Sequence, residues 1–327
     1  MIVYYAVGGG LGHLVRARAF LFTTEITGEV VVLSSSDDKI ARKILADHQI
    51  VKIPDELNGR REALRRWLID WLTGLKPDTL IIDAFPAGIL GEFSGLSFEK
   101  DLELQHVARL LKWDRYYPVT DGHLPHFSKI WVVEPLASEQ SVFLQRYAEE
   151  TTKLSLQDPP ESPDESGPEA LALFLASDRP LWLIVHSQPH EEIEELLGYA
   201  QEQALAEEAS PHLILACPSP PPDLPSSIHH LDIYPASSLF PLVDRIISAC
   251  GFNLMRQTEA FADKHRFIPM LRRFDDQYLR AARRRLHRQK IEASLSTGCD
   301  PSLTARPGTT WCFPTNPCTG NTRRTSP

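Results

Sequence analysis

Hydrophobic and polar positions alternate between two patterns over most of this chain. Short apolar runs, typical of buried strands, are separated by stretches whose apolar residues recur at helical spacing. In the first half the runs cover residues 2–7, 29–34, 79–83 and 129–133, and the clearest helical pattern covers residues 64–75. Because strands separated by helices need crossover connections, this order predicts a parallel sheet with helices on both faces.

The same alternation returns in the second half of the chain. Strands are predicted at residues 181–186, 212–217 and 243–249, and helices at residues 189–206 and 276–290. The sequence therefore predicts an α/β protein built from two Rossmann-like units with parallel sheets.

Composition divides the chain into four parts. Residues 1–154 and 169–290 carry the two alternating patterns and are predicted to be two domains. Residues 155–168 are rich in Pro, Ser and acidic residues, which is typical of a linker or mobile loop. In residues 291–327, Ser, Thr, Gly, Pro and Asn supply 22 of 37 positions, so this tail is predicted to be disordered. A frameshifted or wrongly spliced C-terminus is an alternative for the same segment.

The charge is unevenly distributed. The net charge of the 327 residues is −9, yet residues 264–327 carry 13 Lys and Arg against 4 Asp and Glu. An acidic body argues against a general nucleic-acid-binding protein, whereas the basic stretch suits phosphate or anionic lipid. No apolar run is long enough to span a bilayer, and the N-terminus lacks the pattern of a signal peptide. Cys217 and Cys250 each end an apolar run and are expected to be buried thiols, so a cytoplasmic location is expected.

The glycines between the first strand and the first helix are the strongest candidate site. The sequence Gly-Gly-Gly-Leu-Gly-His at residues 8–13 lets the backbone approach a ligand closely, and the following helix N-terminus suits an anion. The dinucleotide fingerprint G-x-G-x-x-G fails, because His13 stands where its third Gly would be. A tight turn that needs glycine only for its shape remains an alternative.

Two residues are candidate bases. His13 has an imidazole that titrates near neutral pH and can take a proton from a hydroxyl group. Asp83 ends a predicted strand at the edge where parallel sheets bind ligands, and it can position or deprotonate a hydroxyl. The structural alternatives are a hydrogen-bond donor role for His13 and a helix cap for Asp83. The other histidines lack a Cys or carboxylate partner at ligand spacing, so no metal site is expected.

The glycine loop, followed by Arg16 and Ala17, resembles that of nucleotide-sugar glycosyltransferases of the MurG-like and monogalactosyldiacylglycerol-synthase-like type, or glycosyltransferase family 28-like enzymes. These enzymes have two facing Rossmann-like domains, the GT-B fold. The resemblance implies that the N-terminal domain binds the acceptor and the C-terminal domain binds the donor. It also implies that Gly9, Gly10, Gly12 and His13 face the donor diphosphate.

Three further segments resemble the donor side of this family: a Ser-Gln step after a strand, a Gly turn followed by an acidic residue, and an Asp-Gln pair after a strand. The donor-binding residues implied by the resemblance are Ser187, Gln188, Gly251, Phe252, Asn253, Glu259, Asp276 and Gln277. The family's spacing between the Gly and the ribose-binding Glu would select Gln257 instead of Glu259, so both stay open.

The resemblance implies transfer of a sugar from a nucleotide-diphosphate donor, in the first place a UDP-sugar, to an acceptor hydroxyl, with no metal or other cofactor. A nucleotide-sugar 2-epimerase-like isomerase is one alternative. A non-catalytic nucleotide-sugar-binding protein is another, because the family's closing C-terminal helix has no counterpart in the tail. The acceptor is unidentified. A lipid-linked acceptor, with peripheral contact to the inner membrane face through the basic stretch, stays open, and no nucleic-acid partner is expected.

Overall fold

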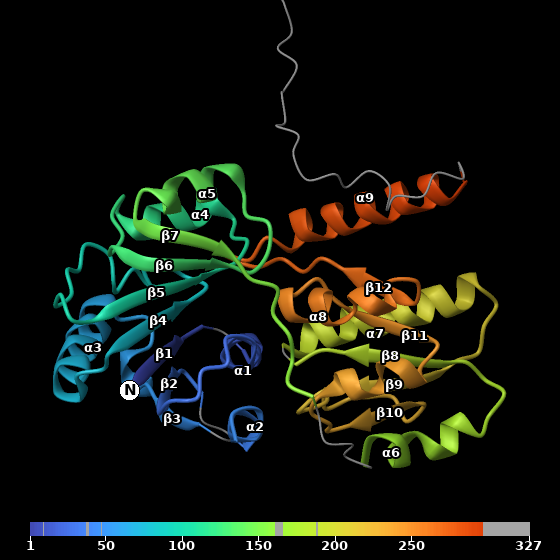
Figure 1. Cartoon of the computed structure of the whole chain (residues 1–327). Helices are drawn as coiled ribbons and strands as arrows, with labels where there is room; N and C mark the ends of the chain where they lie inside the picture. The colour runs from blue at the N-terminus through green and yellow to red at the C-terminus, as the bar shows by residue number, and fades with distance from the viewer. Residues whose placement is uncertain (9, 37–38, 47, 161–165, 188, 297–327) are drawn as a thin grey trace, which may run out of the picture. The chain divides into compact units, whose positions relative to one another are not determined.

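The chain forms two parallel β-sheets, as the computed structural model in Figure 1 shows. The structure describes residues 1–8, 10–36, 39–46, 48–160, 166–187 and 189–296. The first sheet has the order β3-β2-β1-β4-β5-β6-β7, with strands Ile2–Ala6, Val30–Ser34, Gln49–Lys52, Thr79–Asp83, Glu103–Ala108, Phe127–Val132 and Ala148–Lys153 for β1 to β7. The second sheet has the order β10-β9-β8-β11-β12, with strands Leu181–Val185, His212–Ala216, Ile228–Leu231, Arg245–Ala249 and His265–Ile268 for β8 to β12.

Helices connect the strands in both units, as crossovers between parallel strands require. Along the first sheet they are α1 (Gly12–Thr23), α2 (Lys39–Ile44), η1 (Asp55–Leu57), α3 (Arg61–Leu75), α4 (Trp113–Tyr116), η2 (Tyr117–Thr120) and α5 (Ser138–Gln145). Along the second sheet and after it they are α6 (Ser166–Leu175), α7 (His190–Ala206), η3 (Ala236–Leu242), α8 (Phe252–Gln257), η4 (Glu259–Phe261) and α9 (Gln277–Ser296).

Each sheet changes its direction of growth at one strand. In the first sheet β1 lies between β2 and β4, and in the second sheet β8 lies between β9 and β11. In open parallel sheets, ligands bind at the carboxyl ends of the strands at such a reversal. The loops after β1, β4, β8 and β11 are therefore the places where this topology puts a site. The predicted fold class, α/β with two parallel-sheet units, is confirmed.

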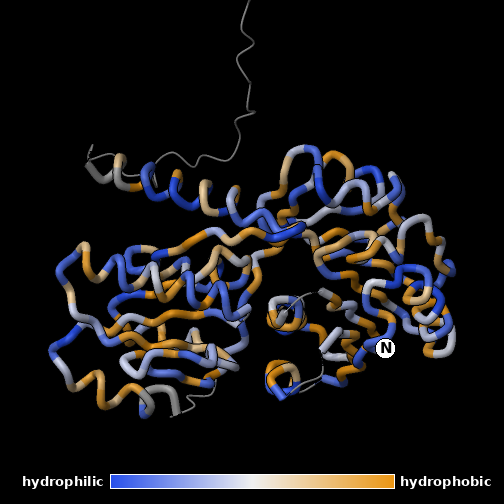
Figure 2. Tube along the Cα trace, turned by 180° about the vertical axis from the view of Figure 1, so that it is seen from behind, coloured by the Kyte–Doolittle hydropathy of each residue, from blue (hydrophilic) through white to orange (hydrophobic). Residues whose placement is uncertain are grey.

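The central strands of the first sheet, β1, β2 and β4, are buried on both faces. The side chains of Val3 and Tyr5 on β1 pack in the cluster that contains the leucines of α3. Their neighbours Tyr4 and Ala6 pack in the cluster that contains the apolar side of α1. Because both faces are covered, β1 is apolar throughout, and Figure 2 shows hydrophobic colouring along the central strands.

The second sheet follows the same rule. Trp182 and Ile184 of β8 pack against α7, while Leu181, Leu183 and Val185 pack on the other face, in the cluster that contains η3 residues. All five side chains are buried, which explains why this strand is a continuous apolar run in the sequence.

Several elements differ from the sequence prediction. The apolar pattern missed β3, β5, β7, β10 and β12, of which the family resemblance alone indicated β12. Strand β7 is an edge strand with mostly exposed polar residues, so it has no apolar run to detect. Helix α6 begins at Ser166, and α9 continues to Ser296, past the predicted end at Lys290. The predicted disordered tail beyond Ser296 lies outside the described residues, and the domain boundaries stay a prediction.

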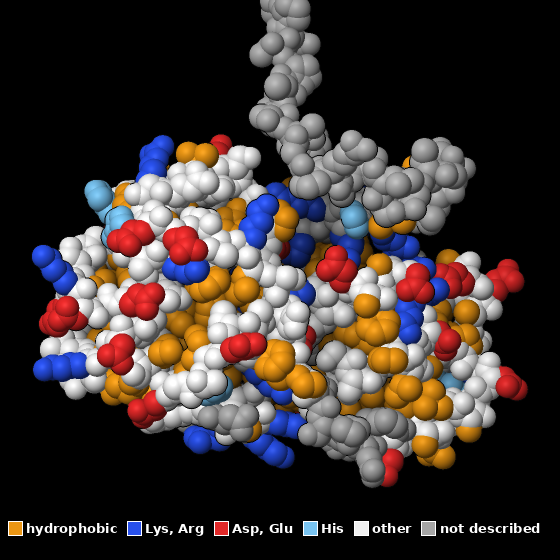
Figure 3. All heavy atoms as spheres, viewed as in Figure 1, with side chains coloured by type: hydrophobic (Ala, Val, Ile, Leu, Met, Phe, Trp, Pro, Cys, Tyr) orange, Lys and Arg blue, Asp and Glu red, His pale blue; other side chains and the backbone are white. Residues whose placement is uncertain are grey.

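The surface is mixed in character. Figure 3 shows acidic and basic side chains interspersed with hydrophobic ones over the face in view. Within the described part of the chain, no helix combines the length and apolarity that crossing a membrane requires.

Candidate functional site

A cavity of about 580 Å³ lies where both sheets present the carboxyl ends of their reversal strands. This volume is within the range of about 300–1,000 Å³ that is usual for small-molecule sites. Its walls include residues from the loops after β1, β4, β8 and β11, namely Gly10, Leu11, Gly12, Phe85, Ile89, His186, Ser187, Gly251, Phe252, Asn253 and Leu254. The cavity therefore brings together six described residues that the sequence singled out, namely Gly10, Gly12, Ser187, Gly251, Phe252 and Asn253.

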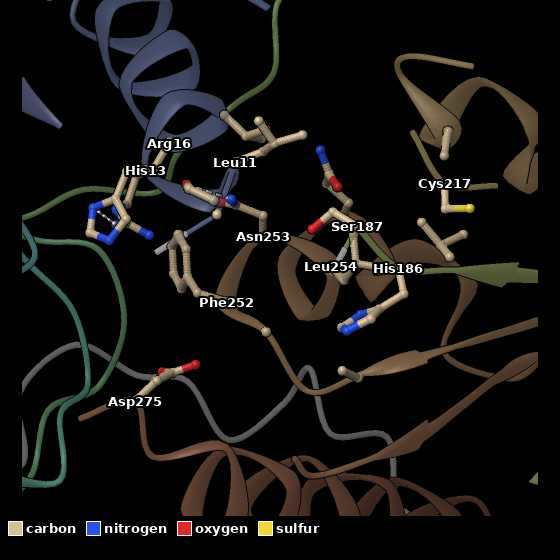
Figure 4. Close-up of a pocket in the computed structure, with 18 of the residues that line it drawn as sticks. Leu11, His13, Arg16, His186, Ser187, Cys217, Phe252, Asn253, Leu254 and Asp275 are labelled. Carbon is tan, nitrogen blue, oxygen red and sulfur yellow. Dashed lines mark hydrogen bonds between the residues drawn. The ribbon is translucent and has the colours of Figure 1, made fainter. Parts of the chain in front are cut away.

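His13 lines this cavity and forms a buried pair with Asp83, which is not part of the cavity wall. His13 lies in the first turn of α1, Asp83 is the last residue of β4, and His13 Nδ1 is 2.6 Å from Asp83 Oδ2. Because an ionised carboxylate can only accept, the proton of the imidazole lies on Nδ1, and Nε2 carries the lone pair. Arg16 Nη2 is 3.2 Å from the same nitrogen (Figure 4), but it also donates to Asp83 Oδ2 at 2.5 Å.

Asp83 is held ionised by its neighbours. Arg16 donates to both of its oxygens, from Nε at 2.7 Å and from Nη2 at 2.5 Å, and the Tyr4 hydroxyl donates at 3.1 Å. Burial alone would raise the pKa of Asp83, but the Arg16 guanidinium and the His13 hydrogen bond hold that pKa well below its usual range. Burial lowers the pKa of His13, and the Asp83 carboxylate only partly offsets this. At neutral pH His13 is therefore a neutral imidazole.

Gly8 makes room for the His13 ring. A Cβ atom on Gly8 would lie 2.1 Å from His13 Nε2, closer than any side chain permits. On its other side the His13 ring faces Phe85, with ring centroids 5.6 Å apart. The position of Nε2 thus depends on a glycine in the loop, which gives one of the consecutive glycines a steric reason.

A second group of buried charges lies at the same cavity. Asp275 lines the cavity, and its Oδ1 accepts hydrogen bonds from Arg109 Nη1 at 2.5 Å and from Arg280 Nη2 at 2.9 Å. Arg280 also holds Glu134, with Nε and Nη2 each 2.8 Å from a carboxylate oxygen. Burial would raise the pKa of Asp275, but Arg109 and Arg280 hold that pKa well below its usual range. Asp275 is therefore a fixed negative charge.

Around β8, a carboxylate links two parts of the cavity wall. Glu192, in the first turn of α7, accepts from Arg272 and is 2.8 Å from His186 Nε2. Ser187 follows His186 and lines the cavity (Figure 4). Arg273, the residue after Arg272, also lines the cavity and is exposed. It has no carboxylate partner among the described residues.

The part of the cavity around β9 is mainly apolar. Burial raises the pKa of Cys217 to about 11, so its thiol is protonated at neutral pH and acts as a small apolar side chain. The other apolar lining residues here are Val185, Ala216, Pro218, Ile233, Pro235, Ala236, Phe240 and Leu254.

The loop after β11 contacts the glycine loop directly. Asn253 Nδ2 donates to the Gly12 carbonyl at 2.9 Å, and the Arg16 guanidinium lies 5.6 Å from the centre of the Phe252 ring. Figure 4 shows Phe252 and Asn253 next to the start of α1. Gly251, which precedes α8, lines the cavity. These predicted donor residues thus lie beside the loop that was predicted to bind the diphosphate.

Four other predicted residues are placed differently from one another. Glu259 is exposed and is not part of the cavity wall, whereas Gln257 lines the cavity and donates to Asp158 at 3.1 Å. Asp276 accepts from the Leu279 backbone N–H at 3.0 Å at the start of α9. Gln277 lines the cavity, but its Oε1 accepts from the backbone N–H groups of residues 250 and 270, at 3.1 and 2.9 Å.

Two predicted residues, Gly9 and Gln188, lie outside the described residues. Over the part of the chain that is described, no three His, Cys, Asp or Glu side chains form a group that can hold a metal ion. The ribose and sugar roles suggested by the resemblance stay predictions.

Sequence reasoning gave no role to Arg16, Arg109 or Asp275, and it expected Arg280 on a basic helix face open to solvent, phosphate or a membrane. The structure buries Arg280 against Glu134 and Asp275 instead. Arg16 lies one helical turn after His13, so its spacing places it on the same face of α1 and was a usable signal. Asp275 stands directly before Asp276, at the start of α9, and pairs with Leu111 in a short β-bridge. Its place next to a predicted site residue was therefore only a weak indication of a role. Nothing local pairs Arg109 with Asp275, since they are 166 positions apart.

No protein-family model matches the sequence, and no curated protein matches it either. Solved structures do match its fold. A structure described as an S. aureus MnaA–UDP co-structure aligns with a TM-score of 0.55 and 12% identity over 87% of both chains. Spinosyn rhamnosyltransferase SpnG aligns with a TM-score of 0.54 and 16% identity over 87% of this chain and 83% of that chain.

A third match is a UDP-N-acetylglucosamine 2-epimerase, described as putative, from Listeria monocytogenes. It has a TM-score of 0.51 and 12% identity over 83% of this chain and 80% of that chain. The chain therefore shares the fold of GT-B glycosyltransferases and of UDP-N-acetylglucosamine 2-epimerases, and the predicted GT-B-like fold is confirmed.

Proposed function

We propose that this protein is a glycosyltransferase that moves a sugar from a nucleotide-diphosphate donor, in the first place a UDP-sugar, to an acceptor hydroxyl. The observation that carries the proposal is the buried His13–Asp83 pair at the cavity, with Nδ1 of His13 2.6 Å from the carboxylate. This pair leaves the Nε2 lone pair to accept a proton, as a general base must.

The cavity offers separate surroundings for the parts of such a donor. The apolar wall around Cys217 suits a nucleobase, and Gln257, which also lines the cavity, suits a ribose hydroxyl group. The N-terminus of α1, which has unpaired backbone N–H groups, and the exposed Arg273 suit the diphosphate. The MnaA neighbour, whose description names UDP, supports this choice of nucleotide.

The chemistry follows from these groups. The acceptor oxygen attacks the anomeric carbon while its proton passes to His13 Nε2, and the bond between that carbon and the phosphate oxygen breaks. The leaving nucleoside diphosphate takes the electron pair of that bond, and backbone N–H groups and arginine stabilise its charge. Asp83 keeps the imidazole in the required tautomer and stabilises the positive charge that His13 gains. Nothing in this sequence of steps requires a metal ion.

This role predicts a pH dependence with a definite sign. His13 works as a base only when it is neutral, and burial lowers its pKa below the ordinary value of 6.5. The rate is therefore expected to be independent of His13 protonation at pH 7 and above. As pH falls through the lowered pKa, the rate is expected to fall with the fraction of neutral His13.

The test uses water as the acceptor, because hydrolysis of a donor needs no knowledge of the natural acceptor. Binding of UDP, GDP and TDP is first measured by calorimetric titration, and slow release of the nucleotide from the matching sugar donor is then followed. His13→Ala is expected to lower this rate by about 100-fold or more, with the donor Kd unchanged, as loss of a general base requires. The matched control is His126→Ala, an exposed histidine. If no nucleotide binds, or both variants hydrolyse the donor equally fast, the proposal fails.

The Listeria neighbour, a UDP-N-acetylglucosamine 2-epimerase by its description, suggests epimerisation of the donor sugar as a second candidate reaction. The same donor assay distinguishes the two reactions. Epimerisation needs groups that exchange protons with the sugar. Asp275 is the carboxylate among the described cavity-lining residues, and two arginines hold it ionised. This favours transfer over epimerisation. Formation of a 2-epimer from the donor without an acceptor would reverse that conclusion.

A further inference from the structure

Three arginines near the cavity are almost completely buried. The exposed fractions of Arg16, Arg109 and Arg280 are 3%, 6% and 7%. Arg16 places the Nε and Nη2 edge of its guanidinium on Asp83, at 2.7 and 2.5 Å. Arg280 places the same edge on Glu134, at 2.8 Å for both nitrogens. This edge presents two parallel N–H groups that match the two oxygens of a carboxylate.

Arg109 does not use that edge on the protein. It donates from Nη1 to Asp275 at 2.5 Å and makes a longer contact of 3.5 Å with the Leu110 carbonyl. Its Nε is buried, and no described residue accepts a hydrogen bond from Nε or Nη2. Asp275 therefore fixes the guanidinium through Nη1, and the Nε and Nη2 edge has no acceptor among the described residues.

Other arginines with an unpaired buried Nε differ in this respect. Arg61 and Arg256 both use Nη2, on Asp121 at 2.7 Å and on Asp158 at 2.7 Å. Neither of them lines the cavity, whereas Arg109 does. Among the described residues, the combination of an unused edge, near-complete burial and a place in the cavity wall belongs to Arg109.

The position of Arg109 relates this edge to the candidate reaction centre. The carbon of its guanidinium lies 5.6 Å from the centre of the Phe85 ring, and that ring lies 5.6 Å from the ring of His13. Buried polar groups in proteins are almost always paired, so a buried N–H at a ligand cavity points to an acceptor atom on the ligand.

We propose that Arg109 binds a carboxylate of the substrate, close to the reaction centre, through its Nε and Nη2 edge. This inference deepens the proposed function and rests on it, since the carboxylate belongs either to the transferred sugar or to the acceptor. A carboxylate is the group that the same edge holds on Arg16 and Arg280. The diphosphate has other donors, namely the N-terminus of α1 and Arg273.

The experiment compares ligands that differ only by this group. UDP-glucuronate is titrated against UDP-glucose, which has a hydroxymethyl group in place of the carboxylate, and 4-hydroxybenzoate is titrated against phenol in the absence of nucleotide. The first pair tests a sugar carboxylate and the second an acceptor carboxylate. We expect the wild-type protein to bind the carboxylate member of one pair about 10- to 100-fold more tightly, as two charge-assisted hydrogen bonds imply.

The variant Arg109→Lys keeps a positive charge for Asp275 but lacks the two-pronged edge. It is expected to lose the preference for the carboxylate ligand, while the matched control Arg61→Lys, at an arginine that does not line the cavity, keeps it. The proposal is wrong if neither pair shows a preference in the wild-type protein, or if the preference survives in Arg109→Lys. It is also wrong if Arg109→Lys weakens UDP, UDP-glucose and UDP-glucuronate equally, since the edge would then bind the diphosphate. Failure of all nucleotides to bind would reject the proposed function, and the phenol pair would still decide the role of Arg109.

Discussion

His106 makes the stability of the first sheet depend on pH, although it takes no part in the candidate site. It lies on β5, is fully buried, and donates from Nδ1 to the Ile82 carbonyl at 2.8 Å. A second proton would have to go to Nε2, which is buried and has no hydrogen-bond partner among the described residues. Burial therefore lowers the pKa of His106 from 6.5 to about 4.

The sign of the effect follows from proton binding. Above pH 6.5 neither the native nor the unfolded chain protonates this residue, so His106 contributes nothing to the pH dependence. Between about pH 6.5 and pH 4 the unfolded chain binds a proton that the native protein does not, so the free energy of unfolding falls as pH falls. A tenfold difference in proton affinity is worth about 1.4 kcal/mol, so the full loss is roughly 3 kcal/mol.

The assay is urea unfolding at several pH values between 7.5 and 4. His106→Gln cannot take up a proton and retains an N–H for the Ile82 carbonyl. Its free energy of unfolding should therefore fall by roughly 3 kcal/mol less than that of wild type between pH 7.5 and 4. The matched control is His126→Gln, at an exposed position on the same unit, which should follow the wild-type curve. Parallel curves for wild type and His106→Gln would show that His106 does not make the free energy of unfolding depend on pH.

Two further substitutions test the backbone and the charges near the site by urea unfolding at pH 7.5. Gly88 has a φ of +81°, and a Cβ there would lie 2.1 Å from the Glu92 carboxyl carbon, whereas Gly95 has a φ of +64° with nothing within 4 Å. Gly88→Ala should therefore cost at least about 1–2 kcal/mol more than Gly95→Ala, and equal losses would show that Glu92 moves aside freely. Asp83→Asn leaves Arg16 buried without its counter-charge and should cost about 3–5 kcal/mol, so a loss below about 1 kcal/mol would contradict the ion pair described here.

Sequence reasoning reached the fold and the first half of the site because both depend on local pattern. Apolar runs mark strands that are buried on both faces, such as β1, β4 and β8. The residues that follow those strands must lie at the carboxyl edge of a sheet, so His13 and Asp83 were identifiable. The edge strand β7 was missed because it is mostly exposed and carries no such run.

The site residues in the second half of the chain were harder to predict from the sequence, for a physical reason. Helix α8 ends at Gln257, so Glu259 falls in the short turn η4 and its side chain reaches solvent. The side chain of a residue just after a helix points in a direction that depends on where the helix ends. The spacing of residues in the sequence does not determine that end point. Asp276 and its neighbour Asp275 look alike in the sequence, yet one caps a helix and the other pairs with Arg109. Such pairing becomes visible only once the chain has folded.

The long separation between Arg109 and Asp275 has a consequence for biosynthesis. The ribosome completes all seven strands of the first sheet by Lys153, but Asp275 follows Arg109 by 166 positions and Arg280 follows Glu134 by 146. At about 5–20 residues per second, the partner of Arg109 emerges roughly 8–33 s later. During that interval the nascent first unit contains an arginine and a glutamate that native folding buries, without their counter-charges. The native packing around β5 and β6 is therefore completed only after Asp275 and Arg280 have been synthesised, and a nascent chain arrested before Asp275 should be more sensitive to proteases there than the full chain.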